Sequence, residues 1–279
     1  MKYQTVVSDI DATLMPQDNG TKLKSEVAQT IIELEQSGVM IILASARAYP
    51  GVAPIAKQLK MDEFGGYIIT ENGASIYDAK TNELMFAHEM AKTDVLKLWK
   101  LCQEYEIDFA FSQKEQMIAS DFSKGFFLDH CNCDIDYVVT NHPKRFMIDP
   151  IMKCSLSKNE RKIKEIYPLI KQSVEQTYPY KVYYSTANII DILAKECGKE
   201  AALQQLADSN LMSWNTTAAI GDSYSDIAMI QKAALGATLE NGKNECKEVC
   251  DLIVESCEND GCISFFQTIM KENKSVDKA

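Results

Sequence analysis

The sequence lacks any apolar run near the ~18 residues that a membrane-spanning helix needs. It also lacks the paired cysteine and histidine spacings of structural zinc sites, and it has no linker rich in proline, glycine and serine. Positive charge is scarce, since 29 Lys and Arg face 40 Asp and Glu for a formal charge of −11. These absences argue against a membrane protein, against a fold stabilised by structural zinc, and against a protein that binds nucleic acid through a large net positive charge.

The apolar run after Lys2 ends at Asp9, which is too short for the core of a signal peptide. We therefore expect a cytoplasmic protein whose nine cysteines are free thiols. The composition, 46% hydrophobic and 25% charged, is typical of a soluble globular protein. A chain of 279 residues is long enough for one large domain or two smaller ones.

Both ends of the chain alternate short apolar runs with helical patterns, as in a parallel sheet covered on both faces. We predict strands at 3–8, 39–43, 67–70, 189–193, 216–220, 235–239 and 252–254. We predict helices at 25–37, 52–59, 199–207, 226–233 and 261–270.

The middle of the chain alternates less regularly and predicts an α+β insertion. Its predicted strands are 109–112, 126–128, 146–148 and 180–184, and its predicted helices are 93–104 and 159–177. The fold class is therefore α/β, a Rossmann-like doubly wound parallel sheet with an inserted α+β domain. We place the core at 1–83 and 188–279 and the insertion at 84–187.

Asp9 and Asp11 stand where the first predicted strand ends. In parallel α/β sheets, ligands bind outside the carboxyl ends of the strands. Two carboxylates this close repel each other, and a hard cation such as Mg²⁺ relieves the repulsion. One of them could also attack an electrophile while the other moves the proton. The plainer alternative is an acidic turn that merely ends a strand.

Two further segments supply groups suited to an anion. Ser45 follows the second predicted strand, where its hydroxyl and the neighbouring backbone N–H groups suit a phosphate. Lys199 stands at the start of a predicted helix, an unfavourable place for a cation unless a ligand is present. The alternatives are a helix cap for Ser45 and a surface lysine for Lys199.

The last segment is Gly221-Asp222-Ser223-Tyr224-Ser225-Asp226, in which a strand runs through a turn into a helix. Asp222 falls on the same predicted rim as Asp9 and could complete a metal site. Ser223 and Asp226 also fit the S-x-x-D capping box, and Asp226 could orient its neighbours from behind the metal ligands. Taken in order, the four segments predict a pocket for a cation and an anion together.

These four segments resemble the motifs of the haloacid dehalogenase-like (HAD) phosphatases, in particular the Cof-type branch with a large inserted cap (subclass IIB). The motifs stand here as Asp9-Ile10-Asp11-Ala12-Thr13-Leu14, Ser45-Ala46-Arg47, Lys199, and Gly221 to Asp226. Glu71-Asn72-Gly73-Ala74 and Asn259-Asp260-Gly261 resemble further stretches of that branch. The resemblance spans the chain.

The resemblance implies a role for each matching residue. Asp9 would form an aspartyl-phosphate, and Asp11 would protonate the leaving oxygen and then activate water. Mg²⁺ would be held by Asp9, the backbone of Asp11, and Asp222, with Asp226 in support. The phosphoryl group would meet the residues Ile10, Ser45, Ala46, Arg47, Lys199 and Ser225. The implied activity is hydrolysis of a small phosphorylated metabolite such as a sugar phosphate, with no nucleic-acid or membrane partner.

Three residues depart from the family pattern. Ala12 and Ala46 replace usual glycines, and Ser225 replaces a usual asparagine. They motivate one alternative, a sugar-phosphate-binding protein without turnover. A second alternative is a phosphosugar mutase, which would need several arginines in the cap, whereas only Arg145 and Arg161 lie there. Cap residues that could meet the substrate are Tyr137, His142, Lys144 and Arg145, and an exposed loop is the plainer interpretation of each.

Overall fold

A computed structural model describes residues 1–17 and 20–276 of the chain. Contacts divide it into two units. We call residues 1–46, 52–86 and 198–279 the core unit, and residues 47–51 and 87–197 the inserted unit. Within the described ranges, no helix combines the length and apolar character needed to cross a bilayer.

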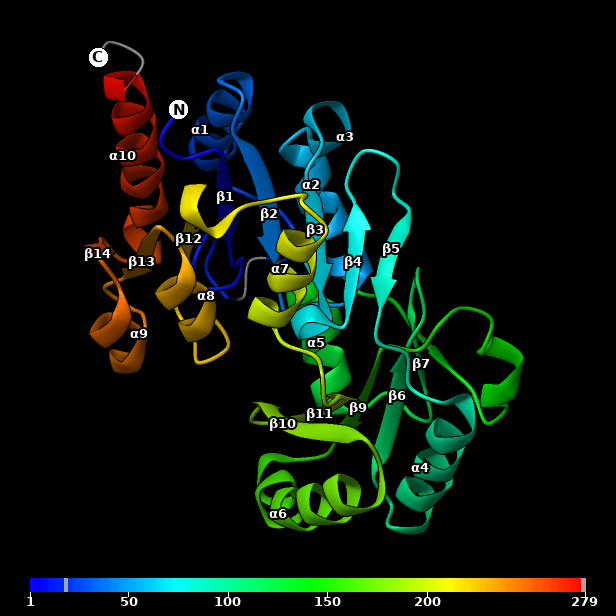
Figure 1. The fold of residues 1–279 in the computed structure, drawn as a ribbon. Coiled ribbons are helices and arrows are strands. Elements are labelled where there is room, and N and C mark those ends of the chain that lie inside the picture. The colour runs from blue at the N-terminus through cyan, green and yellow to red at the C-terminus, as the bar shows by residue number, and fades with distance from the viewer. Residues whose placement is uncertain (18–19, 277–279) are drawn as a thin grey trace. The chain divides into compact units, whose positions relative to one another are not determined.

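The core unit is built on an eight-stranded sheet in the order β14-β13-β12-β1-β2-β3-β4-β5 (Figure 1). Its strands are β1 (Thr5–Ser8), β2 (Met40–Ala44), β3 (Tyr67–Thr70), β4 (Ser75–Asp78), β5 (Leu84–Ala87), β12 (Thr217–Ile220), β13 (Leu235–Leu239) and β14 (Leu252–Val254). The pairs from β14 to β3 are parallel, and β4 pairs with β3 in the antiparallel sense. The predicted parallel α/β core is therefore confirmed.

Helices cover this sheet because their apolar residues recur at helical spacing. In α1 (Ser25–Gln36) the residues Val27, Ile31 and Leu34 are buried, and Gly38 follows with φ 89°. A buried cluster packs α7 (Lys199–Asp208) and α8 (Ile227–Lys232) on one sheet face, with Val7 and Ile42 among its strand residues. The remaining helices are α2 (Ala53–Gln58), α3 (Met61–Phe64), α9 (Asn244–Val249) and α10 (Gly261–Val276).

The order of the core strands sets the place of a ligand site. From β1 the chain proceeds outward to β2 and β3, whereas β12, β13 and β14 proceed outward on the other side. The switch between the two directions lies between β1 and β12, which are adjacent and parallel. Ligands of doubly wound sheets bind at the carboxyl ends of the strands that flank such a switch. Asp9 and Asp222 occupy those two ends.

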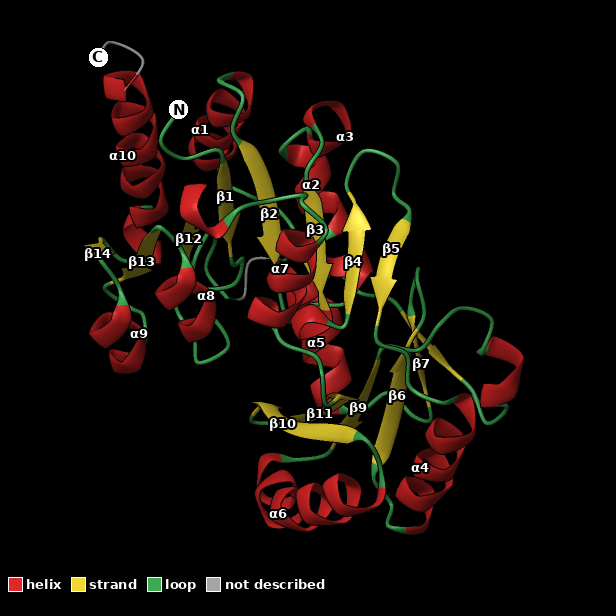
Figure 2. Cartoon of the chain, in the orientation of Figure 1, coloured by secondary structure: helices red, strands yellow, loops and turns green. Residues whose placement is uncertain are grey.

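The inserted unit carries a six-stranded sheet in the order β10-β11-β9-β6-β7-β8, with β7 and β8 parallel and the other pairs antiparallel. Its elements are α4 (Lys92–Glu104), β6 (Asp108–Ser112), β7 (Met117–Ala119), α5 (Lys124–Cys133), β8 (Tyr137–Val139), β9 (Lys153–Ser157), α6 (Glu160–Thr177), β10 (Tyr180–Thr186) and β11 (Ile189–Ala194). Figure 2 shows this mixture of helices and strands.

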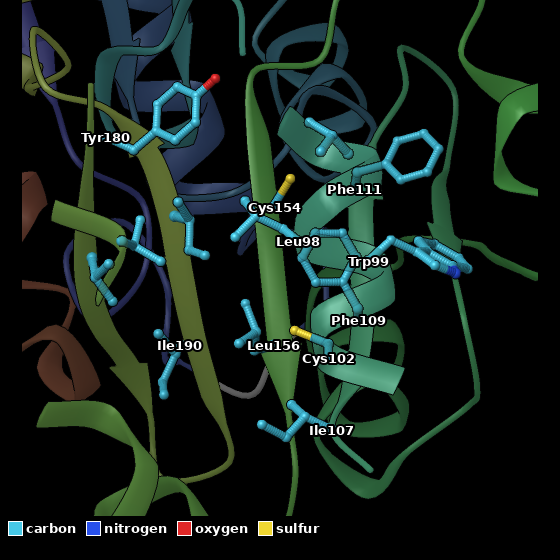
Figure 3. Packing of buried hydrophobic residues seen from close by; sticks show 14 of the residues in the cluster. Leu98, Trp99, Cys102, Ile107, Phe109, Phe111, Cys154, Leu156, Tyr180 and Ile190 are labelled. Carbon is cyan, nitrogen blue, oxygen red and sulfur yellow. The ribbon is translucent and has the colours of Figure 1, made fainter. Parts of the chain in front are cut away.

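One apolar core holds the inserted unit together. Residues from α4, α6 and one face of the sheet form it, and the Trp99 ring meets Phe109 and Phe111 edge-on at 5.7 and 5.9 Å (Figure 3). A separate cluster on the other sheet face includes Phe126 of α5 and Ala110 of β6. The two faces of this sheet are therefore covered by different elements.

Two predicted strands of the insertion are wrong. Residues 126–128 lie in α5, where the Ser123 hydroxyl accepts the Phe126 N–H at 3.4 Å and starts the helix. Phe126 is buried but Phe127 is 50% exposed, since an α-helix turns only one of them inward. Residues 146–148 form no strand, because the Gln113 side-chain oxygen accepts the Ile148 and Asp149 N–H groups.

The predicted strand 189–193 exists but belongs to the other sheet. β11 pairs with β9 and β10 in the inserted unit, so our boundary between 187 and 188 falls about ten residues early. Every residue of β11 is buried, which mimics the continuous apolar run of a parallel core strand. The described cysteines are free, as expected. The elements that were not predicted are β4, β5, β7, β8, β9, α3, α5 and α9.

Candidate active site

Three strand ends bring polar residues to one rim of the core sheet. Asp9 follows β1, and its N–H donates to the Ile220 carbonyl at 3.0 Å, which ties it to the neighbouring β12. Asp222 follows β12 after one glycine, and Ser45 follows β2 directly. The parallel pairing of these strands gives their carboxyl ends a common edge.

Lys199 joins this rim from the first residue of α7. Its ammonium donates to Asp9 Oδ1 at 2.7 Å and to Asp226 Oδ1 at 2.6 Å. The three residues are buried, with exposed fractions of 2% for Lys199, 5% for Asp9 and 0% for Asp226. A lysine at a helix start is thus compensated by two carboxylates, and the surface interpretation of Lys199 is wrong.

Asp226 fixes the turn between β12 and α8. Its second oxygen accepts the Ser223 hydroxyl at 2.7 Å and the Ser223 N–H at 2.9 Å. The Asp226 N–H donates to the Ser223 carbonyl, so only one half of the proposed capping box forms. A Cβ on Gly221 would lie 2.5 Å from the Asp226 side chain, which explains the glycine there. Both Asp226 oxygens are therefore occupied by the protein, which suits support rather than direct ligation.

The buried carboxylates of the site repel one another, which shifts their pKa values. Burial raises the pKa of Asp9 well above its ordinary value, Asp226 raises it further, and Lys199 opposes them. Burial and Asp226 likewise raise the pKa of Asp222 to about 6. Burial alone would lower the pKa of Lys199, but Asp226 and Asp9 together raise it, so Lys199 stays protonated. One ammonium thus faces three carboxylates.

The same residues fit a hard divalent cation. One oxygen each from Asp9, Asp222 and Asp226 lies within 4.8 Å of the others. The donors are all oxygen, as Mg²⁺ prefers, and Mg²⁺ commonly uses one or two carboxylates plus water and substrate oxygens. Asp9 and Asp222 are the members with a strand-end position, and the Thr13 hydroxyl orients Asp222 at 3.4 Å. Burial and the neighbouring carboxylates raise both pKa values, and a cation here would offset both effects.

The turn after Asp9 is held by contacts that sequence reasoning missed. The Ile10 carbonyl accepts the N–H groups of Thr13, Leu14 and Met15. Ala12 has φ 54°, a left-handed conformation that favours glycine, the usual residue at this place in the family that the sequence resembles. The Asn241 amide donates to the Ala12 carbonyl at 2.9 Å. Asn241 comes from the segment after β13, and no local sequence signal indicates it.

The segment after β3 packs against the backbone next to Lys199. Glu71, Asn72 and Gly73 follow β3 in succession with positive φ values. A Cβ on Gly73 would lie 2.1 Å from the carbonyl oxygen of Gly198, the residue before Lys199. The Glu71-Asn72-Gly73 segment therefore packs against the backbone that carries Lys199, which gives a physical reason for a glycine there.

The remaining predicted phosphate contacts divide between the units. Ser45 is fully buried, Ala46 is partly buried and Ser225 is exposed, all in the core unit. Arg47 belongs to the inserted unit, where its guanidinium donates to the Gly51 carbonyl at 3.2 Å and the Asn132 carbonyl at 3.5 Å. These bonds give Arg47 a structural role, and its contact with substrate stays a prediction.

The four residues of the insertion that were predicted to contact substrate fall into two groups. The Tyr137 hydroxyl donates to Asp129 at 2.6 Å and its ring stacks on Phe126, so packing and one hydrogen bond account for it. His142, Lys144 and Arg145 lie together beside α4, in a short 3₁₀ segment and the residue before it. That group is treated separately below.

Comparisons with known proteins agree with this geometry. A family model described as haloacid dehalogenase-like hydrolase matches residues 6–266. A phosphoglycolate phosphatase of Staphylothermus marinus is 27% identical over 263 residues, 94% of this chain and 95% of that protein. A haloacid dehalogenase-like hydrolase from Bacteroides thetaiotaomicron matches in structure with TM-score 0.89 at 23% identity, covering 96% of this chain and 100% of that one. A HAD subclass IIB sugar phosphatase matches with TM-score 0.72 at 18% identity over 95% and 98% of the two chains.

Proposed function

The chain belongs to the haloacid dehalogenase-like hydrolase family, and we propose that it is a Mg²⁺-dependent phosphatase of a small phosphorylated metabolite. The observation that carries the proposal is the buried Lys199 held between Asp9 and Asp226, with Asp222 on the same rim. This arrangement offers a nucleophilic carboxylate, a cation for the phosphoryl oxygens and an oxygen cluster for a metal.

In the proposed first step, an Asp9 oxygen attacks phosphorus and the bond to the leaving oxygen breaks. Asp11, two residues on and half-buried, gives its proton to that oxygen, so the alcohol leaves neutral. In the second step Asp11 takes a proton from water, and the water oxygen attacks phosphorus. Phosphate departs, and Asp9 returns as a carboxylate.

Lys199 has two tasks in this scheme. Before substrate binds, its ammonium compensates Asp9 and Asp226. With substrate present, the same donor can hold a phosphoryl oxygen beside Asp9, and the Ser45 hydroxyl is proposed for another. Since Lys199 is almost fully buried, its charge acts in a medium that screens it poorly. Its contribution to the transition state is therefore large.

Asp9, Asp222 and the Asp11 backbone are proposed to hold Mg²⁺. When bound, the ion supplies charge stabilisation to the phosphoryl oxygens and offsets the repulsion between the carboxylates. Asp226 supports the site by fixing Lys199 and the turn that carries Asp222.

The substrate class rests on the relatives. One is named for phosphoglycolate and another for sugar phosphates, both small phosphorylated metabolites. We propose a sugar phosphate as the first substrate class to test, because the inserted unit is of the kind found in the subclass IIB sugar phosphatase.

The test is release of phosphate from p-nitrophenyl phosphate and from a panel of sugar phosphates. We expect release with Mg²⁺, none with EDTA, and none from Asp9→Asn. Asp62→Asn is the matched control, since Asp62 is an exposed aspartate of the core unit. Release by Asp9→Asn at the wild-type rate would refute Asp9 as nucleophile. Sugar-phosphate binding without release from a folded, Mg²⁺-loaded protein would favour a binding protein instead.

A further inference from the structure

A second pocket lies wholly within the inserted unit, and no residue assigned to catalysis lines it. It encloses about 320 Å³ between α4 and the segment 141–145. Lys100 of α4 and Lys144, Arg145 and His142 of the facing segment line it. None of the residues that line it is acidic, in a chain whose formal charge is −11.

The side chains of Lys100, His142, Lys144 and Arg145 are exposed, and they have no hydrogen-bond or ion-pair partner within the described ranges. Lys97, on the same helix as Lys100, behaves differently, since it pairs with Asp94. Three cationic side chains that line one pocket with no counter-ion among the described residues favour an anion as the occupant.

Two side chains hold the segment that follows the pocket residues. The ammonium of Lys92, the first residue of α4, donates to the carbonyls of Met147 and Ile148 at 2.9 and 3.3 Å. The Gln113 side-chain oxygen accepts the N–H groups of Ile148 and Asp149. The chain that follows Arg145 is therefore held against α4, and a ligand would meet a site that exists before binding.

The floor of the pocket is apolar and aromatic. Leu96, Trp99 and Pro143 line it below the charged groups. Trp99 is 2% exposed, and Figure 3 shows it beside Phe109 and Phe111 of the unit's core. Its indole N–H makes no hydrogen bond to another described residue, and it is not one of the buried polar atoms that lack a partner, so solvent or a ligand can reach it.

We propose that this pocket binds a small organic anion that carries a flat apolar part. The anionic group meets Lys100, Lys144 and Arg145, and the apolar part rests on Leu96, Trp99 and Pro143. The volume suits a compact metabolite rather than a polymer. The site is distinct from the phosphoryl site, which lies in the core unit, and does not depend on the proposed phosphatase activity.

The experiment uses the full chain with ¹⁵N label and phenylphosphonate as the probe. Phenylphosphonate has an anionic head and a ring, and a phosphatase cannot hydrolyse its carbon–phosphorus bond. The chain has two tryptophans, so it gives two indole N–H signals. Trp214 donates to Gln204 in the core unit and serves as internal reference. Titration in EDTA should shift the Trp99 signal saturably and leave the Trp214 signal in place.

Paired variants test the charges. Lys144→Gln/Arg145→Gln should weaken binding by about tenfold or more, since charge-assisted contacts are lost. Arg161→Gln/Lys162→Gln removes the same charge from α6 in the same unit and should bind as the wild type does. The far-ultraviolet circular dichroism of both variants confirms that they fold.

Three results would overturn the proposal. One is no saturable shift of the Trp99 signal, and another is equal weakening by both double variants. The third is that inorganic phosphate binds as tightly as phenylphosphonate, since the apolar residues of the pocket would then contribute nothing to the binding affinity.

Discussion

Gly73→Ala tests whether the Glu71-Asn72-Gly73 segment positions Lys199. Gly73 has φ 87°, and an added Cβ would lie 2.1 Å from the Gly198 oxygen and 2.5 Å from the Gly198 carbonyl carbon. Carbon and oxygen atoms in contact need about 3.5 Å, so a contact of 2.1 Å requires the two backbones to separate by roughly 1.4 Å. Gly198 precedes Lys199, so that shift moves the ammonium away from Asp9 and Asp226.

The expected magnitudes follow from two separate costs. A left-handed alanine costs about 1–2 kcal/mol, and overpacking adds about 1–3 kcal/mol, so the free energy of unfolding should fall by about 2–5 kcal/mol. A displacement of about 1 Å at a catalytic group lowers kcat by about a hundredfold. The loss of activity should therefore exceed what partial unfolding explains.

Gly65→Ala is the matched control. Gly65 has φ 93°, close to that of Gly73, but nothing lies within 4 Å of its added Cβ. It carries the conformational cost alone, about 1–2 kcal/mol, with kcat unchanged. Urea denaturation gives the free energies, and release from p-nitrophenyl phosphate under native conditions gives kcat. If both variants lose the same stability and keep the same kcat, the close approach to Gly198 does not position Lys199.

Three further predictions concern buried charge. Burial raises the pKa of Glu35 from 4.5 to about 8, and neither oxygen has a partner among the described residues. The folded state thus keeps a proton that the unfolded state loses, and stability should fall between about pH 4.5 and pH 8 by about 1.4 kcal/mol per pH unit. Urea denaturation across that range should show the fall abolished in Glu35→Gln and kept in Glu33→Gln, an exposed neighbour on α1. Lys199→Met should lower kcat by about 10²–10³ and stability by about 3–5 kcal/mol, because it leaves carboxylates uncompensated; a stable, active variant would contradict this. Mg²⁺ should raise the Tm of the wild type and not that of Asp222→Asn, measured by scanning calorimetry; equal shifts would refute Asp222 as a ligand.

Much of the core could be predicted because its signals are local. The run at 39–43 is apolar throughout and those at 3–8 and 67–70 are rich in apolar and β-branched residues, as is typical of strands buried on both faces. The helical period of α1 and the glycine after it mark a helix and its end. The strand ends at Asp9 and Asp222 then followed from position alone. The same rule misassigned β11, because a fully buried antiparallel strand has the same apolar pattern.

Supporting contacts could not be predicted, because they join residues far apart in the sequence. Asn241 reaches the Ala12 carbonyl across 229 positions, and nothing near Asn241 indicates it. The buried state of Lys199 was equally invisible, since a lysine at a helix start is usually exposed. The cations of the second pocket belong to two segments about 40 residues apart, Lys100 and the stretch that ends at Arg145.

The sequence by itself determined which chemical groups are available and at which strand ends they fall. Strand patterns and turns are local, and the carboxyl ends of parallel strands share an edge whatever the details of packing. Only the tertiary structure decided which groups act as partners: that Lys199 lies between Asp9 and Asp226, that Gly73 supports Gly198, and that Arg47 serves its own loop. Those outcomes depend on contacts between segments remote in sequence, which tertiary packing sets and local sequence patterns do not.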